Sequence, residues 1–206
     1  LFPLSVVARE VYLTNASVPY EVIPIETRVS ESQLHLGELD NFPIMYEFVV
    51  EEPIQFRTLL AQPALSTDTP NPLTLMLVRQ DDQGGGVTEV DRLTPEATSW
   101  TPVKYSSLGV TLQEGGEINE ELPAGVYRIE VSTPDNFGKY LLRLGPNNSG
   151  GYFASLSEAW QVQQFLGYSP LKILTSSLIY YPLGIVILIL LIHRTWKYRK
   201  LIKHDS

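Results

Sequence analysis

The chain of 206 residues is long enough for one domain with an appendage, and its 44% of hydrophobic residues can form a packed core. Residues 1–172 hold 22 Asp/Glu against 10 Lys/Arg, whereas the tail after them is basic. An acidic domain repels the phosphate backbone, which argues against nucleic acid, and the lack of cysteine excludes disulfides, thiolate metal sites and a cysteine nucleophile.

Residues 1–8 are an apolar N-terminal stretch. Their sequence, LFPLSVVA, ends in a small-residue pattern like a signal-peptidase site, and the polar residues REVYL follow. We therefore expect residues 1–8 to be the end of a secretory signal peptide, with an ordinary first β-strand as the alternative. Eight residues are too few to span a bilayer, so this stretch is not a second anchor.

Residues 9–145 have the pattern of many short β-strands and almost no helical periodicity. Clusters of glycine, proline, aspartate and asparagine separate the strands. The predicted strands are MYEFVVEE, IQFRTLLAQ, LTLMLVRQ, VTEVDRL, GVYRIEVS and GKYLLRLG. This spacing predicts a mainly β domain, an antiparallel β-sandwich of jelly-roll-like form.

The acidic hairpin loop around DDQGGG offers candidate metal ligands. Asp81, Asp82, Glu89 and Asp91 could approach one another across the hairpin and bind calcium through hard oxygen ligands. Their spacing does not match an EF-hand, and acidic hairpin loops are usually only solvated. We therefore predict no metal site or cofactor, with these four residues as the calcium candidates.

Catalytic motifs are absent from the sequence. His35 is the single histidine before the hydrophobic C-terminal segment, and no G-x-S-x-G nucleophile elbow occurs. We expect His35 to hold a surface loop or strand position, and we predict that the protein is not an enzyme.

Three consecutive segments, MYEFVVEEPIQFRTLLAQ, PLTLMLVRQDDQGGGVTEV and ELPAGVYRIEVSTPDNFGKYLLRL, follow one another in a recognisable order. The order resembles that of the bacterial pre-peptidase C-terminal domain over residues 44–145, most closely at LPAGVY, RIEV and GKYLLRL. The resemblance implies a jelly-roll-like sandwich that acts as an accessory or binding module without catalysis. The family often has an acidic residue before its middle strand, where this chain instead has Asn71-Pro72-Leu73.

Residues 146–168 predict a linker followed by a short amphipathic helix. The stretch GPNNSGG forms a flexible break at the end of the domain. After it, Ser155 and Glu158 have the spacing of a capping box, and Gly167 is a helix stop.

The predicted apolar face of this helix includes Leu156, Trp160 and Leu166, with Phe153 just before it. We expect these four residues to make the juxtamembrane contacts. Two interpretations stay open: the helix lies in the lipid headgroup layer, or it forms a docking surface for a partner membrane protein.

Residues 169–193 predict a transmembrane helix, with Ser169 as a suitable N-cap. The 20 residues between Lys172 and His193 include no Asp, Glu, Lys, Arg or His and would span about 30 Å as a helix, which matches the hydrocarbon thickness. The anchor residues singled out within it are Pro170, Ile173, Pro182, Gly184 and Ile192.

Residues 194–206 form a basic tail. Its anchoring residues are Arg194, Trp196, Lys197, Arg199 and Lys200. Positive charge gathers on the cytoplasmic side of membrane helices, so we expect a cytoplasmic C-terminus and an extracytoplasmic sandwich.

These features together predict a single-pass protein of the cell membrane. We expect it to be a binding, scaffold or accessory subunit without catalysis. The expected partners are the lipid bilayer and a multi-span membrane protein or cell-envelope component, and not nucleic acid. The alternative is a membrane-tethered extracytoplasmic hydrolase or a carbohydrate-binding accessory module of an enzyme.

Overall fold

The structure is a computed structural model. It describes residues 9–16, 18–64, 70–81, 85–94, 100–146 and 151–202, with the backbone alone for residues 198–202. Residues 1–8, for which we predicted a signal peptide, lie outside the described residues.

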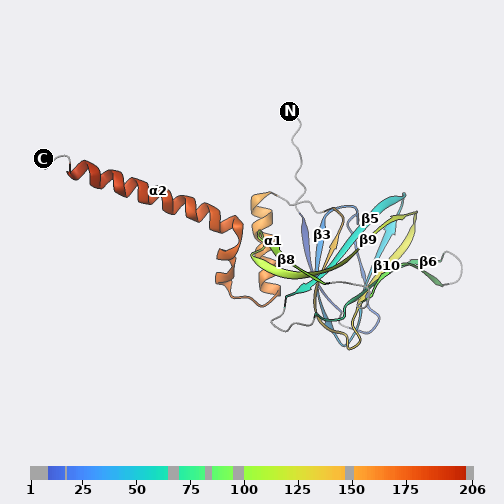
Figure 1. Ribbon diagram of the computed structural model, residues 1–206. Coiled ribbons are helices and arrows are strands. Elements are labelled where there is room, and N and C mark those ends of the chain that lie inside the picture. Colours follow the sequence, from blue (N-terminus) through green and yellow to red (C-terminus); the bar gives the residue numbers. More distant parts are fainter. Residues whose placement is uncertain are drawn as a thin grey trace.

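The strands form two sheets that face each other (Figure 1). Sheet A has six strands in the order β1 (Glu10–Asn15), β3 (Gln33–Asp40), β11 (Phe137–Leu144), β5 (Ile54–Pro63), β9 (Val110–Leu122) and β8 (Thr101–Tyr105). Sheet B has five strands in the order β2 (Val22–Pro24), β4 (Ile44–Val50), β10 (Gly125–Ser132), β6 (Thr74–Gln80) and β7 (Val87–Leu93).

The predicted mainly β sandwich is confirmed, and all six predicted strands are present. The expectation of purely antiparallel pairing is wrong at one edge, where β1 pairs with β3 and β2 pairs with β4 in parallel. The reason lies in the connections. The chain crosses from β1 in sheet A to β2 in sheet B before it returns to sheet A as β3, and such crossovers allow parallel neighbours.

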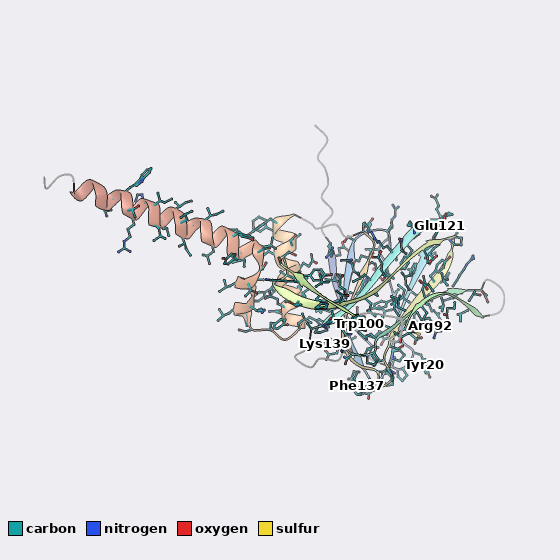
Figure 2. All side chains as sticks on the ribbon, viewed as in Figure 1. Tyr20, Arg92, Trp100, Glu121, Phe137 and Lys139 are labelled. Carbon is teal, nitrogen blue, oxygen red and sulfur yellow. The ribbon has the colours of Figure 1, made fainter. Side chains whose placement is uncertain are left out.

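Three helical segments follow the last strand: α1 (Tyr152–Phe165), the 3₁₀ helix η1 (Pro170–Thr175) and α2 (Ser177–Ile202). We expected Pro170 to begin the membrane helix. Instead it begins η1, and the chain is extended at Ser176, with ψ at 135°, before α2 starts. In Figure 2 the start of α2 lies beside α1 and η1, and beyond it the side chains of α2 project on all sides away from the rest of the chain.

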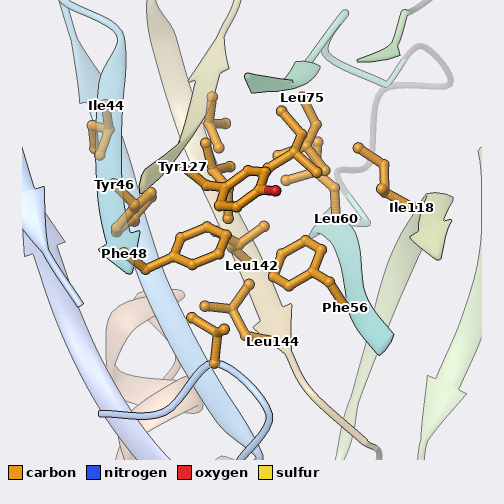
Figure 3. Close-up of a cluster of buried hydrophobic side chains, with 14 of the residues drawn as sticks. Ile44, Tyr46, Phe48, Phe56, Leu60, Leu75, Ile118, Tyr127, Leu142 and Leu144 are labelled. Atoms are coloured by element: carbon orange, nitrogen blue, oxygen red, sulfur yellow. The ribbon is translucent and has the colours of Figure 1, made fainter. Parts of the chain in front are cut away.

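The main core lies between the two sheets, where alternate residues of each strand point inward (Figure 3). Phe48 of β4 stacks on Phe56 of β5 and on Tyr127 of β10, with ring centroids 5.2 and 5.6 Å apart. Aliphatic residues such as Ile44, Leu75, Leu142 and Leu144 surround these rings and are fully or almost fully buried. Each large side chain buried in this way stabilises the fold by about 1.5–3 kcal/mol.

A buried tyrosine pair crosses this core. The hydroxyls of Tyr46 and Tyr140 lie 2.7 Å apart, and Tyr140 faces Gly37 in the register of β11 with β3. A Cβ at Gly37 would lie 2.1 Å from Cζ of Tyr140, so only glycine leaves room for this ring. Burial raises the pKa of Tyr46 to about 12 and raises that of Tyr140 well above its usual value, so both phenols stay protonated.

Sheet A is apolar on its outer face as well, and α1 covers that face as a third layer (Figure 1). The outer cluster of buried residues is Leu34, Leu36, Leu59, Ala61, Leu108, Val110, Leu112, Leu141, Ala159 and Val162. The helix that we predicted as a separate juxtamembrane element is therefore packed on the sandwich, because the sheet needs a cover for its second apolar face.

Candidate functional site at the membrane junction

The inner face of α1 is fixed to the sandwich by a buried ion pair. Nη1 of Arg9 donates to Oε1 of Glu158 at 2.6 Å, and the two side chains are 9% and 7% exposed. The predicted capping box is wrong, because α1 begins four residues earlier, with Gly151 as N-cap and no side-chain cap. Ser155 is consequently a buried position inside the helix, and Glu158 contacts the start of the sandwich.

A second polar contact holds the other end of α1. Nε2 of Gln163 donates to the carbonyl of Leu108 at 2.6 Å, and Gln163 is 2% exposed. Nζ of Lys139, on β11, donates to the carbonyl of Phe165 at 2.7 Å and lies 5.0 Å from the centre of its ring. A cation at the last turn satisfies a free carbonyl and opposes the negative end of the helix dipole.

The predicted stop at Gly167 is confirmed. Gly167 has φ of 77°, in the left-handed region that favours glycine. Its N–H donates to the carbonyl of Gln164 at 2.9 Å, and the N–H of Tyr168 donates to that of Gln163 at 3.0 Å. The chain can therefore turn sharply from α1 into η1.

The turn between β8 and β9, residues 106–109, holds the start of α2. Ser176 donates through Oγ to the carbonyl of Ser107 and accepts from the N–H of Leu178 at 3.2 Å, so it caps α2 while it binds the turn. In addition, the N–H of Ser177 donates to the carbonyl of Ser106 at 2.8 Å. The candidate membrane helix thus begins on the sandwich.

Gly109 lets the turn between β8 and β9 approach the start of α2 closely. Its φ is 67°, and a Cβ there would lie 2.8 Å from the backbone nitrogen of Ser176. Its carbonyl also accepts from Oγ1 of Thr175 at 3.1 Å. The contact between the β8–β9 turn and the start of α2 was not predicted. Ser176, a favourable N-cap before the apolar run, is the signal that could have indicated it.

Pro182 lies inside α2 and has no N–H for the carbonyl of Leu178, four residues earlier. The hydroxyl of Tyr152, the first residue of α1, donates to that carbonyl at 2.5 Å. The preceding helix α1 thus supplies the donor that Pro182 lacks.

The four predicted juxtamembrane residues lie in two different environments. Leu166 is half-buried and packs against the outer cluster of sheet A, and Leu156 is also half-buried. Phe153 and Trp160 are exposed by 83% and 38% and point away from the sheet. They belong to a wider exposed set at the junction, which we call the junction collar: Tyr152, Phe153, Trp160, Tyr168, Leu171, Leu174, Tyr180 and Tyr181.

Beyond the collar, α2 is exposed and apolar. Residues 180–197 are all exposed, and the candidate membrane span, Ser177–Lys197, has 21 residues, about 30 Å at the helical rise. Gly184 has no atom near the position of a Cβ, and Ile192, Arg194, Trp196 and Lys197 lie on this exposed helix. Arg199 and Lys200 continue the helix, and their side chains lie outside the described part.

The acidic hairpin residues are not brought together as one ligand set in the part of the hairpin that is described. Glu89 forms an ion pair with Arg92, Asp91 accepts from the N–H of Arg92, and Asp81 accepts from Thr88. Asp82 lies outside the described residues. Over the described ranges, no group of three His, Asp or Glu side chains could hold a metal ion.

The fold is similar to that of a solved structure, the pre-peptidase C-terminal domain of a collagenase from Bacillus anthracis. The match covers 63% of this chain and 98% of that domain, at 16% sequence identity and a TM-score of 0.36. It is a weak match, to the family that residues 44–145 resemble. No protein-family model and no curated protein matches the sequence.

Proposed function

We propose that this protein is a single-pass membrane protein whose sandwich stands outside the cytoplasm and serves as a binding or accessory module without catalysis of its own. The support comes from the exposed apolar helix α2, from the basic residues that end it, and from the acidic charge of the sandwich. The bilayer is the first partner in this proposal, and a multi-span membrane protein or cell-envelope component is the second.

The observation that carries the proposal is the joint between sandwich and anchor. Four of the contacts link the sandwich, α1 and the start of α2. They are Arg9 with Glu158, Gln163 with the carbonyl of Leu108, Ser176 with the carbonyl of Ser107, and Tyr152 with the carbonyl of Leu178. A module on a free tether needs none of these. The contacts hold the sandwich in a defined orientation relative to α2. This supports a subunit that meets a partner at a fixed distance from the bilayer.

The junction collar supports a position of α1 in the headgroup layer. The inner side of α1 is occupied by sheet A, and α2 leaves from the opposite side (Figure 1). Phe153, Trp160 and Tyr168 are therefore exposed where the bilayer would lie. Aromatic side chains with a polar edge are favoured at this depth, and exposed aliphatic residues such as Leu171 gain by leaving water.

The test uses single cysteines, which are unique because the chain has none of its own. We expect an environment-sensitive fluorophore on Phe153→Cys, in liposomes, to shift to the blue and to be quenched by lipid-borne quenchers. The matched control is Val49→Cys, which is 65% exposed on the sandwich and should show neither effect. Equal behaviour at both sites would exclude a membrane-seated α1.

Orientation and partnership need two further measurements. In intact spheroplasts, a membrane-impermeant maleimide should label Val49→Cys and leave Ser206→Cys unlabelled until the membrane is opened; the reverse pattern would contradict the orientation. A photo-crosslinking residue at position 188 in native membranes should capture a membrane protein, and recovery of lipid adducts alone would exclude the accessory-subunit role.

A further inference from the structure

A cleft with a volume of about 460 Å³ opens between the sheets at the edge formed by β1 and β2. These two strands are the edge strands of sheets A and B, so no further strand closes the layer between them there. Its walls include Tyr12 and Thr14 of β1, Ile23 and Ile25 in and after β2, and Gln33 and His35 of β3. A cleft of this size takes a small molecule.

His35 of β3 lines this cleft and is 4% exposed, so it holds a buried strand position and the predicted surface position is wrong. Its ring stacks on that of Tyr12 at 5.0 Å and meets the edge of Tyr46 at 5.1 Å. These aromatic contacts fix the plane of the imidazole without using its nitrogen atoms.

The hydrogen bonds of Gln33 determine the tautomer of His35. Nε2 of Gln33 donates to the carbonyl of Arg28 at 2.8 Å, which leaves Oε1 of Gln33 to face Nε2 of His35 at 3.2 Å. Because an amide oxygen only accepts, Nε2 of His35 must carry the proton. Nδ1 is then an acceptor, and it is buried without a hydrogen-bond partner among the described residues.

Burial also keeps this acceptor available. Removal from water lowers the pKa of His35 to about 4, so the imidazole is neutral near pH 7 and Nδ1 keeps its lone pair. A buried acceptor without a partner is costly, and a ligand that donates a hydrogen bond would remove that cost.

The charges around the cleft favour a cation. Glu21 and Glu26 are the charged residues among those that line it, and neither Lys nor Arg is among them. The aromatic face of Tyr12 and the aliphatic side chains of Leu13 and Ile23 provide the apolar wall. None of the lining residues belongs to α1, η1 or α2, so occupancy of the cleft does not depend on how the protein sits in a membrane.

We propose that this cleft binds a small organic cation, namely a primary ammonium group on an aromatic or short aliphatic body. An N–H of the ligand donates to Nδ1 of His35, the carboxylates of Glu21 and Glu26 balance its charge, and its body packs against Tyr12 and Ile23. This ligand class goes beyond the proposed function, which assigns the sandwich no ligand.

The first experiment compares four probes that share one ring, titrated by calorimetry against the full chain in detergent micelles at pH 7.5. Benzylamine is a cation with N–H donors, benzyltrimethylammonium a cation without them, benzyl alcohol a neutral donor, and phenylacetate an anion. We expect benzylamine to bind at least about 5-fold tighter than the second and third probes, and phenylacetate not to bind. Equal affinities for all four, or no binding of benzylamine, would overturn the proposal.

Variants then test the assigned residues. His35→Phe keeps an aromatic ring beside Tyr12 but removes the acceptor, and it should weaken benzylamine about 10-fold while it leaves benzyltrimethylammonium unchanged. Should this buried variant not fold, the double variant of the half-buried Glu21 and the exposed Glu26, Glu21→Gln/Glu26→Gln, is decisive: it should abolish the preference for benzylamine over benzyl alcohol. Glu51→Gln/Glu52→Gln, an exposed acidic pair between β4 and β5, is the matched control and should keep that preference. An unchanged preference in the cleft double variant would contradict the site.

Discussion

The hydroxyl of Tyr152 donates a hydrogen bond to the carbonyl of Leu178, the group that Pro182 leaves without its helical donor. The contact joins the first residue of α1 to the first turn of α2, which are 26 positions apart in the chain. A proline in the candidate membrane helix and a tyrosine of α1 are thus one structural unit.

The first prediction concerns this unit. Tyr152→Phe removes the donor and leaves the Leu178 carbonyl unsatisfied, which costs about 1–3 kcal/mol. We expect faster hydrogen exchange in residues 177–181, measured in nanodiscs by mass spectrometry. In a Pro182→Ala background the restored N–H serves the carbonyl, so Tyr152→Phe should then have little effect. Equal effects in both backgrounds would contradict the pairing.

The second prediction concerns the ion pair between Arg9 and Glu158. Both side chains are buried, so Glu158→Ala leaves an uncompensated guanidinium and should destabilise the docked α1 by about 3–5 kcal/mol. Limited proteolysis should then cut within α1 while the sheets stay protected. The double variant Arg9→Met/Glu158→Leu removes both charges and should recover most of the loss. A double variant no better than the single one would show that the pair is not coupled.

The third prediction tests the close approach at Gly109. An alanine there places Cβ 2.8 Å from the nitrogen of Ser176, so Gly109→Ala should separate the turn from the start of α2. Gly85 has a similar φ, 73° against 67°, but no atom near its Cβ position, so Gly85→Ala reproduces the backbone strain alone. Spin labels on Val49→Cys and Leu188→Cys should give a broad distance distribution in the first variant and a narrow one in the control. Similar distributions would argue against a fixed joint.

The fourth prediction is a pH dependence. Burial lowers the pKa of His35 from 6.5 to about 4, so the unfolded chain takes up the proton first as the pH falls. The stability that neutral His35 contributes is complete above pH 6.5, falls between 6.5 and 4, and changes no further below. When the pH falls from 7.5 to 4.5, the free energy of unfolding of the wild type, measured with urea, should decrease by about 2.5 kcal/mol more than that of His35→Phe. Parallel pH profiles would contradict a buried neutral histidine.

The fifth prediction concerns Gly37. Its alanine variant would drive Cβ into the ring of Tyr140, and the cost should be about 3 kcal/mol or more. In a Tyr140→Leu background the same substitution should cost much less, because the ring is gone. Gly184→Ala, which meets no atom, is the neutral control. Thermal unfolding of the four proteins measures the coupling, and additive effects would disprove it.

The strands were predictable because alternation of apolar and polar residues survives in one-sided strands such as β10, Gly125–Ser132. The long strand β9 was missed. Its Gly115-Gly116 pair looks like a turn, although the side chains that pack against these glycines come from Trp100, just before β8, and from Leu93 of β7. The parallel pairing of β1 with β3 and of β2 with β4 could not be predicted from the sequence either, because it depends on which sheet each strand joins.

The helix α1 shows why sequence periodicity failed at the candidate site. Its inward face carries Glu158 and Gln163, whose partners are Arg9 and the carbonyl of Leu108, far away in the sequence. Phe153 and Trp160 are large hydrophobic residues, and yet both are exposed. A helix with the sandwich on one side and apolar exposure on the other has no strong amphipathic pattern, so its buried side cannot be chosen from hydrophobicity alone.

The contacts of Ser176 and Ser177 with residues 106–107 have a consequence for encounters in the membrane plane. A domain on a flexible tether loses rotational freedom when it meets a partner, and that entropy is subtracted from the affinity. In the proposed membrane-anchored protein folding has already removed this freedom, so a partner in the same bilayer would meet the sandwich at one fixed tilt relative to α2. Because of these contacts the sandwich cannot tilt relative to α2, and the rotation that remains to it is rotation about the axis of α2.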